Sequence, residues 1–254
     1  MQAFPRMQID PLSPVLAARR LPGAVPGVVL STAALAVAAL AAQQQLALRG
    51  LYVPVVLGAF LLGAAVVLRA ALRHAEASFG AANQVTLIRG ALTSLVAGLL
   101  IAETSAAVLW FAIAVAGLAL LLDGVDGSVA RRRGSVSAFG ARFDMETDAL
   151  SIVVLAALVW HFDKAGAWVM LSALLRYAFV AAGRAWPWMR APLPPSRRRQ
   201  TVCVVQIGAL LVCLVPFVPA EESAAIAAAA LVMLAASFAI DTCWLARHAV
   251  PRGL

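Results

Sequence analysis

Residues 123–148 read DGVDGSVARRRGSVSAFGARFDMETD and bring four aspartates, Asp123, Asp126, Asp144 and Asp148, close together along the chain. The whole chain is 63% hydrophobic, and the last two aspartates lie on a segment apolar and long enough to cross a membrane. An ionised carboxylate in the hydrocarbon costs at least about 2.5 kcal/mol, so four at similar depth require a compensating positive charge. A bound cation is the simplest source, and we expect the chemistry of the protein at this cluster.

The composition places the protein in a membrane. Mean hydropathy is +0.92, only 13% of the residues are charged, and several apolar runs exceed the roughly 18 residues that span a bilayer. The predicted fold class is therefore all-α, a polytopic bundle of integral membrane helices. Eight apolar spans are expected, at 24–43, 51–70, 87–102, 105–123, 143–161, 165–183, 201–219 and 223–245.

These spans divide the chain into four regions. Residues 1–23 contain prolines and are interpreted as a cytoplasmic tail, residues 24–70 as two membrane helices, and residues 247–254 as a second tail. The largest region, 71–246, is expected to hold a helix in the membrane interface over 73–89, where charges flank a moderately polar centre, and six membrane helices. A signal peptide that is cleaved after the first span is the alternative for the N-terminal segment.

The formal net charge of +8 comes from arginines that flank the apolar spans, so nucleic acid is not an expected partner. With a cytoplasmic N-terminus, one side of the membrane collects most of these arginines, and the connection from 123 to 142 lies on that side. We therefore expect the cluster at the cytoplasmic face of a bacterial inner membrane, among membrane lipid. The cysteines follow no metal-ligand spacing and are interpreted as small buried residues, namely Cys203, Cys213 and Cys243.

The spacing of the aspartates predicts a metal site. The first pair is three residues apart and the second four, so on helices each pair faces one direction. Two such faces opposed to each other form a box of four carboxylates. Oxygen ligands without histidine or cysteine select a hard cation, with Mg²⁺ first and Mn²⁺ or Ca²⁺ behind it. Gly127 and Gly140 would allow close approach of helices or of a phosphate, and the guanidinium of Arg131 suits a phosphate.

The stretch also matches a longer pattern, which is Asp, two residues, Asp-Gly, two residues, Ala-Arg, eight residues, Gly, three residues, Asp, three residues, Asp. This resembles the signature of the CDP-alcohol phosphatidyltransferase family at every fixed position. The resemblance covers residues 83–246 and implies a six-helix core, to which this chain adds two N-terminal helices. It also implies a reaction in which an acceptor hydroxyl attacks CDP-diacylglycerol, CMP leaves and a phosphodiester lipid forms, and it implies a homodimer.

The resemblance assigns roles to residues of the signature. It implies that Asp123, Asp126 and Asp144 bind metal, while Asp148 acts as general base and touches a second metal, so two ions of Mg²⁺ or Mn²⁺ are expected. Upstream, three polar residues at three-residue steps resemble the Asn-Thr-Arg entry segment of the family, although the proline that often precedes the asparagine is Ala82 here. The implied nucleotide-binding set comprises Asn83, Thr86, Arg89, Gly127, Ala130, Arg131 and Gly140.

Arg176 interrupts the sixth span and has two interpretations. It either forms an ion pair with Glu146 or binds an anionic acceptor, because an arginine inside the membrane normally faces protein, water or an anion. The candidate acceptor-binding residues are Arg133, Arg176, Arg197 and Arg199. The basic clusters that contain them are also typical of anchors near anionic head groups.

The number of cytoplasmic arginines favours a phosphorylated acceptor, such as glycerol 3-phosphate or inositol phosphate. Serine and choline stay open as neutral or cationic acceptors, since Trp186 and Trp188 offer aromatic contacts. A different class of function is a divalent-cation transporter with the carboxylates at the membrane midplane. A position at the membrane edge beside the Ala-Arg and glycine positions argues against transport, and the complete set of aspartates argues against an inactive scaffold.

Overall fold

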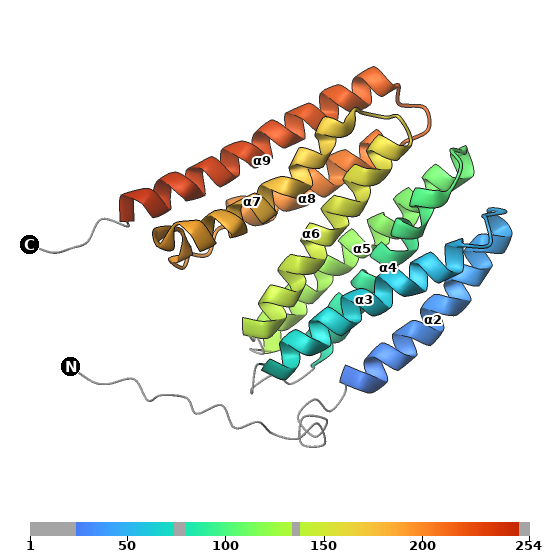
Figure 1. Ribbon diagram of the computed structural model, residues 1–254, viewed down its shortest axis with the longest axis horizontal. Helices are drawn as coiled ribbons and strands as arrows, with labels where there is room; N and C mark the ends of the chain where they lie inside the picture. The colour runs from blue at the N-terminus through green and yellow to red at the C-terminus, as the bar shows by residue number, and fades with distance from the viewer. Residues whose placement is uncertain (1–23, 74–79, 134–137, 249–254) are drawn as a thin grey trace, which may run out of the picture.

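The computed structural model describes residues 24–73, 80–133 and 138–248, and within these ranges all regular structure is helical (Figure 1). Alanine and leucine, which have the highest helix propensities, dominate the apolar runs. The α-helices are α2 (Ala24–Gln45), α3 (Tyr52–Arg73), α4 (Ala81–Ala97), α5 (Ala106–Arg133), α6 (Ala138–His161), α7 (Leu171–Ala185), α8 (Arg197–Cys213) and α9 (Ala220–His248). Three short 3₁₀ helices join them, η1 (Gly98–Ile101), η2 (Ala167–Met170) and η3 (Pro187–Arg190).

These eight α-helices confirm the predicted all-α membrane bundle. Five stretches of the described residues are long and apolar enough to cross a membrane, and they lie in α2, α3, α4 with η1, α5 and α9. The helices α7 and α8, with 15 and 17 residues, are shorter than the 18 residues of a full span. The helix α6 is long enough, but Arg142, Asp144, Glu146 and Asp148 make its first half strongly polar. The less apolar α-helices of the described chain are therefore α6, α7 and α8.

The third helix begins earlier than its hydropathy indicates. We expect a span from residue 87 and a separate interfacial helix over 73–89, but α4 runs without a break from Ala81, and Arg73 is the last residue of α3. The interfacial helix is therefore wrong for residues 81–89, and 74–79 lie outside the described ranges. The reason is that Asn83, Thr86 and Arg89 are buried inside the bundle, at 5%, 4% and 3% exposure, instead of facing head groups.

The helix α4 lies at the centre of the packing. It contacts α5 and α6 on one side and α2 and α3 on the other, while α8 packs against α6 and α9, and α7 packs against α6 and α9. In Figure 1, α2 and α9 accordingly lie at opposite sides of the bundle. Large apolar side chains on the outer faces of α2 and α3 are exposed, as expected for helices that face lipid; they include Val29, Leu30, Val37, Leu62 and Val66.

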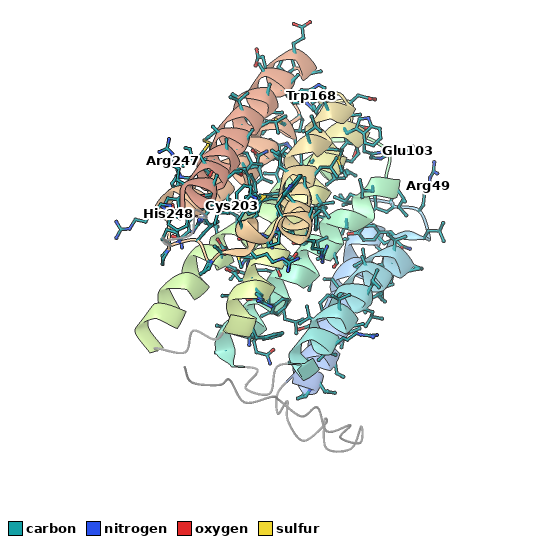
Figure 2. The ribbon with its side chains drawn as sticks, turned by 60° about the vertical axis from the view of Figure 1, so that its left-hand side comes forward. Arg49, Glu103, Trp168, Cys203, Arg247 and His248 are labelled. Atoms are coloured by element: carbon teal, nitrogen blue, oxygen red, sulfur yellow. The ribbon has the colours of Figure 1, made fainter. Side chains whose placement is uncertain are left out.

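Three contacts link the N-terminal helices to the core. The hydroxyl of Tyr52, a fully buried residue at the start of α3, donates to the carbonyl of Leu95 in α4 at 2.9 Å. At the end of α4 the backbone comes so close that a Cβ on Gly98 would lie 2.5 Å from Cγ2 of Val56. At the edge of the bundle, Figure 2 shows Arg49 next to Glu103, which form an ion pair at 2.7 Å between the two connecting loops.

Candidate metal and nucleotide site

Three of the four aspartates of the signature meet in space. Asp123 comes from α5, and Asp144 and Asp148 come from consecutive turns of α6. One carboxylate oxygen of each lies within 4.8 Å of the others, and all three side chains are partly buried. The four-residue spacing on α6 puts two carboxylates on one helix face, and the packing of the bundle brings that face to Asp123.

This arrangement fits a hard divalent cation. The donor set consists of carboxylate oxygens, which Mg²⁺ and Mn²⁺ prefer. Metal–oxygen bonds of about 2.1 Å for Mg²⁺ place oxygens on opposite sides of one ion about 4.2 Å apart, close to the observed separation. The three carboxylates could therefore share one such ion.

Several predicted site residues have side chains outside the described part of the structure. Asp126 lies in α5 one turn after Asp123, and the same helix carries four further members of the predicted set, which are Gly127, Ala130, Arg131 and Arg133. Gly140, by contrast, is described and lies in the first turn of α6, one turn before Asp144. The predicted box is thus described for three of its four carboxylates.

Arg89 lies among the aspartates, which the sequence analysis does not anticipate. Its side chain, from α4, is only 4% exposed. Its Nη1 atom lies 2.8 Å from Oδ1 of Asp123 and 2.5 Å from Oδ1 of Asp144, and its Nη2 atom forms an ion pair with Asp148. Buried carboxylates need a nearby positive charge, which predicts a cation at this place but does not indicate that Arg89 supplies the charge.

Asn83 and Thr86 lie on the same face of α4 as Arg89, as their three-residue spacing predicts. Both are buried, and the hydroxyl of Thr86 donates to the carbonyl of Ala82 at 3.1 Å. Thr86 lies about one turn, and Asn83 about two turns, before Arg89 in the direction of the start of α4. The entry segment is therefore continuous with the site, and contact of these residues with a nucleotide stays a prediction.

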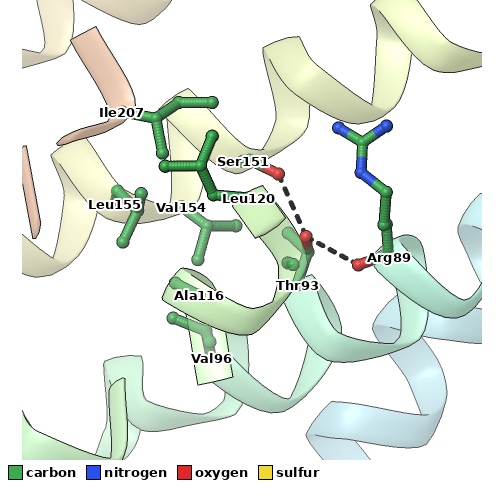
Figure 3. A pocket seen from close by; sticks show the side chains of 10 residues that line it. Arg89, Thr93, Val96, Ala116, Leu120, Ser151, Val154, Leu155 and Ile207 are labelled. Carbon is green, nitrogen blue, oxygen red and sulfur yellow. Dashed lines mark hydrogen bonds between the residues drawn. The ribbon is translucent and has the colours of Figure 1, made fainter. Parts of the chain in front are cut away.

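Hydroxyl groups tie α4 to α6 directly beside the cluster. The Thr93 hydroxyl donates to the backbone carbonyl of Arg89 at 2.9 Å and lies 3.0 Å from the hydroxyl of Ser151, which donates to Thr147. Figure 3 shows the two contacts of Thr93 and a cavity that Arg89, Thr93 and Ser151 line together with apolar residues such as Val154 and Ile207. Arg89 therefore belongs both to the aspartate cluster and to the polar part of the cavity lining.

The helix α8 also reaches the cluster, through Cys203. Its thiol lies 3.8 Å from Oδ2 of Asp148, and Figure 2 shows this residue within the bundle. The prediction of a small buried residue is confirmed for Cys213, whose thiol donates to the carbonyl of Ser223. It is wrong for Cys243, which is exposed on α9, and Cys203 is a neighbour of the site that a spacing pattern cannot reveal.

Two of the predicted acceptor arginines have protein partners. Arg176 forms an ion pair with Glu146 at 2.5 Å, which is the structural one of its two interpretations. Glu146 lies two residues after Asp144, and residues two apart on a helix point about 200° away from each other. Arg176 therefore contacts the face of α6 opposite the aspartates.

The second predicted acceptor arginine that has a protein partner is Arg199, which contacts Asp241 of α9 at 3.4 Å. Its neighbour Arg198 contacts the same carboxylate at 2.5 Å and also the backbone carbonyl of Ser237. Asp241 is nearly buried, and the sequence analysis does not single it out. Arg197 is exposed at the start of α8, and Arg199 lies one turn before Cys203, on the side of α8 that leads to the cluster.

Comparison with protein families shows that the site lies in a region matched by a known family. A family model described as CDP-alcohol phosphatidyltransferase matches residues 79–241, more than half of the chain. The match begins after α3 and extends into α9, which agrees with a core preceded by two extra helices. Comparisons with curated proteins and with solved structures gave no match. Three of the four signature aspartates gather at one site in the matched region, and the chain belongs to the CDP-alcohol phosphatidyltransferase family.

Proposed function

We propose that this protein transfers the phosphatidyl group of CDP-diacylglycerol to the hydroxyl of a small polar alcohol and releases CMP. Membership in the family makes the protein a membrane transferase of phospholipid biosynthesis that uses a CDP-linked donor. The observation that best supports transfer from CDP-diacylglycerol is that Asp123, Asp144 and Asp148 meet beside the buried start of α4. A lipid-linked diphosphate needs both a cation site and a bundle that faces lipid.

The aspartates would hold Mg²⁺ or Mn²⁺, with Asp123, Asp126 and Asp144 as ligands of one ion and Asp148 also near a second. When bound, the metal neutralises the diphosphate and stabilises the CMP leaving group. The chain itself supplies the positioning. Each carboxylate is on a helix rather than a loop, and the Thr93–Ser151 contact ties the helix of Arg89 to the helix of Asp148.

Asp148 is the proposed general base. It has the least exposed side chain of the three described acids, at 21%, and it would accept the proton of the acceptor hydroxyl. As the hydroxyl oxygen forms its bond to the phosphorus next to diacylglycerol, the bond from that phosphorus to the CMP oxygen breaks. CMP leaves with the electron pair of that bond, and the proton rests on Asp148.

The nucleotide would lie against the entry segment. Asn83 and Thr86 share the face of α4 that leads to Arg89, and their burial makes them part of a pocket wall rather than of the lipid-facing surface. From the other helices, we propose that the segment after Asp123 and the start of α6 surround the same nucleotide, through Gly127, Ala130, Arg131 and Gly140.

The acceptor is proposed to be a small phosphorylated alcohol, such as glycerol 3-phosphate or inositol phosphate. The supporting residues are Arg133, Arg197 and Arg199, because Arg199 lies one turn from the residue that touches Asp148. We leave Arg176 out of this set because its partner Glu146 lies on the face of α6 opposite the aspartates. Serine or choline is the alternative acceptor class, and an assay with several acceptors decides between them.

We also propose that the site opens at the cytoplasmic face of a bacterial inner membrane and that the protein forms a homodimer. The starts of α4, α6 and α8 carry the site residues, and the arginine-rich stretches of the chain adjoin them, as the positive-inside rule expects. This location also separates the proposal from transport. Asp144 lies in the second turn of α6, close to the N-terminal end of that helix, whereas a transport site is expected near the membrane midplane.

The test is release of CMP by the purified protein in nanodiscs, with labelled CDP-diacylglycerol, Mg²⁺ or Mn²⁺, and one acceptor at a time. We expect release that depends on one acceptor and stops with a chelator. The matched control is Glu146→Gln, which removes an exposed acid from the opposite face of α6. Absence of acceptor-dependent release with every alcohol rejects the transferase, and Mn²⁺ flux into proteoliposomes without donor lipid would support the transporter.

A further inference from the structure

The guanidinium of Arg89 and a divalent cation have the same ligands. Arg89 bonds to Asp123, Asp144 and Asp148, and these are the three carboxylates that lie close enough to share an ion. A buried guanidinium in contact with all three already supplies positive charge to the cluster. A divalent cation on the same carboxylates would lie within a few ångströms of it, where two positive charges repel strongly.

We propose that Arg89 and the divalent cation compete for the aspartate cluster, and that Arg89 turns to the diphosphate of the donor when the metal binds. The second half rests on the proposed function, because only a diphosphate donor supplies the new partner. A guanidinium group that forms bidentate hydrogen bonds with carboxylates can form the same bonds with phosphate oxygens. Arg89 is then a positioning residue that links occupation of the metal site to occupation of the nucleotide site.

The surroundings of Arg89 suit a movement of the side chain alone. Its backbone carbonyl accepts a hydrogen bond from Thr93, and Thr93 contacts Ser151 on α6, so the helix at this point is held in place. The side chain joins Thr93 and Ser151 in the polar part of the cavity lining (Figure 3). Asn83 and Thr86 lie on the same face of α4, in the direction of the proposed nucleotide.

Competition has a reciprocal consequence. If the metal releases Arg89 for a diphosphate, a bound diphosphate must raise metal affinity by the same factor, since coupling between two ligands is symmetric.

The first experiment measures binding of Mn²⁺ alone to the purified protein, from the electron paramagnetic resonance signal of free Mn²⁺. Arg89→Gln should bind Mn²⁺ about tenfold more tightly than the wild type, within the range typical of coupled sites. Arg89→Lys keeps the charge but has one ammonium group, so its affinity should lie between the two. The control is Arg142→Gln, which removes an exposed charge two residues before Asp144.

An unchanged or weaker Mn²⁺ affinity of Arg89→Gln, relative to Arg142→Gln, overturns the proposal. If Arg89→Gln does not fold, Arg89→Lys decides, because equal affinity of Arg89→Lys and wild type has the same meaning. A second measurement titrates CDP by calorimetry with and without saturating Mn²⁺. The gain in CDP affinity from Mn²⁺ should be smaller in Arg89→Gln than in the wild type, and an equal gain contradicts the link.

Failure of this proposal and failure of the proposed function give different results. Mn²⁺ binding needs neither the donor lipid nor an acceptor. Tighter Mn²⁺ binding by Arg89→Gln, without CMP release by the wild type, would keep the competition and reject the transferase. CMP release with unchanged Mn²⁺ affinity of Arg89→Gln would do the reverse.

Discussion

Arg89 of α4 and Asp144 of α6 form an ion pair at 2.5 Å across 55 residues of sequence. The same guanidinium contacts Asp123 of α5, so one side chain connects three helices of the bundle. A charge that is 4% exposed normally needs such partners, since an unpaired buried charge is strongly destabilising. The site is therefore part of what holds α4, α5 and α6 together, as well as the place where we expect the reaction.

Asp148→Asn should lower CMP release by about 10²- to 10⁴-fold, the usual contribution of a general base. Asparagine has nearly the same shape but cannot accept the proton of the acceptor. Asp144→Asn should be at least as severe, because it removes a metal ligand. Both variants should insert into membranes and elute as the wild type in size-exclusion chromatography, and near-normal turnover by either would remove its proposed role.

Arg176→Gln should change the KM values for donor and acceptor to the same small extent. Its partner Glu146 is largely exposed, and ion pairs of this kind contribute about 0–1 kcal/mol to stability. Steady-state kinetics with each substrate varied in turn provide the measurement, with Glu146→Gln as the reference. A rise confined to the KM of the acceptor would return Arg176 to the acceptor-binding set.

Tyr52→Phe should lower the free energy of unfolding by about 1 kcal/mol, because it removes a buried hydrogen bond to the carbonyl of Leu95. The measurement is thermal unfolding in detergent, monitored by circular dichroism. Tyr177→Phe is the control, since Tyr177 is 45% exposed on α7. Equal effects of the two substitutions would mean that this bond does not fasten the N-terminal helices to the core.

Gly98→Ala should destabilise the protein by about 1–3 kcal/mol, the usual range for overpacking. The new methyl group would lie 2.5 Å from Cγ2 of Val56 and 2.7 Å from Cε2 of Tyr52, so α3 must move away. Gly117→Ala in α5 is the matched control, because no heavy atom lies within 4 Å of its added Cβ. That change should be neutral or stabilising, as alanine has the higher helix propensity. The same unfolding assay compares them, and a neutral Gly98→Ala would contradict the close contact.

The sequence alone predicts much of this protein, because the relevant signals are local. Long apolar runs predict the helices, and a four-residue step puts Asp144 and Asp148 on one face whatever the helix packs against. The signature resembles that of a family whose model matches residues 79–241. Hydropathy misplaces the start of α4, since Asn83, Thr86 and Arg89 lower the average whether they face head groups or a buried site.

Contacts between distant segments depend on the tertiary structure. Nothing in the spacing of Arg89 indicates that it meets three aspartates, that Cys203 lies beside Asp148, or that Asp241 holds two arginines of α8. Periodicity determines which way a side chain points from its own helix, but its partners depend on how helices cross, and that is set by packing summed over the whole bundle. The sequence therefore determined the helices, the family and the acidic residues of the site, and the packing decided which positive charge those residues meet.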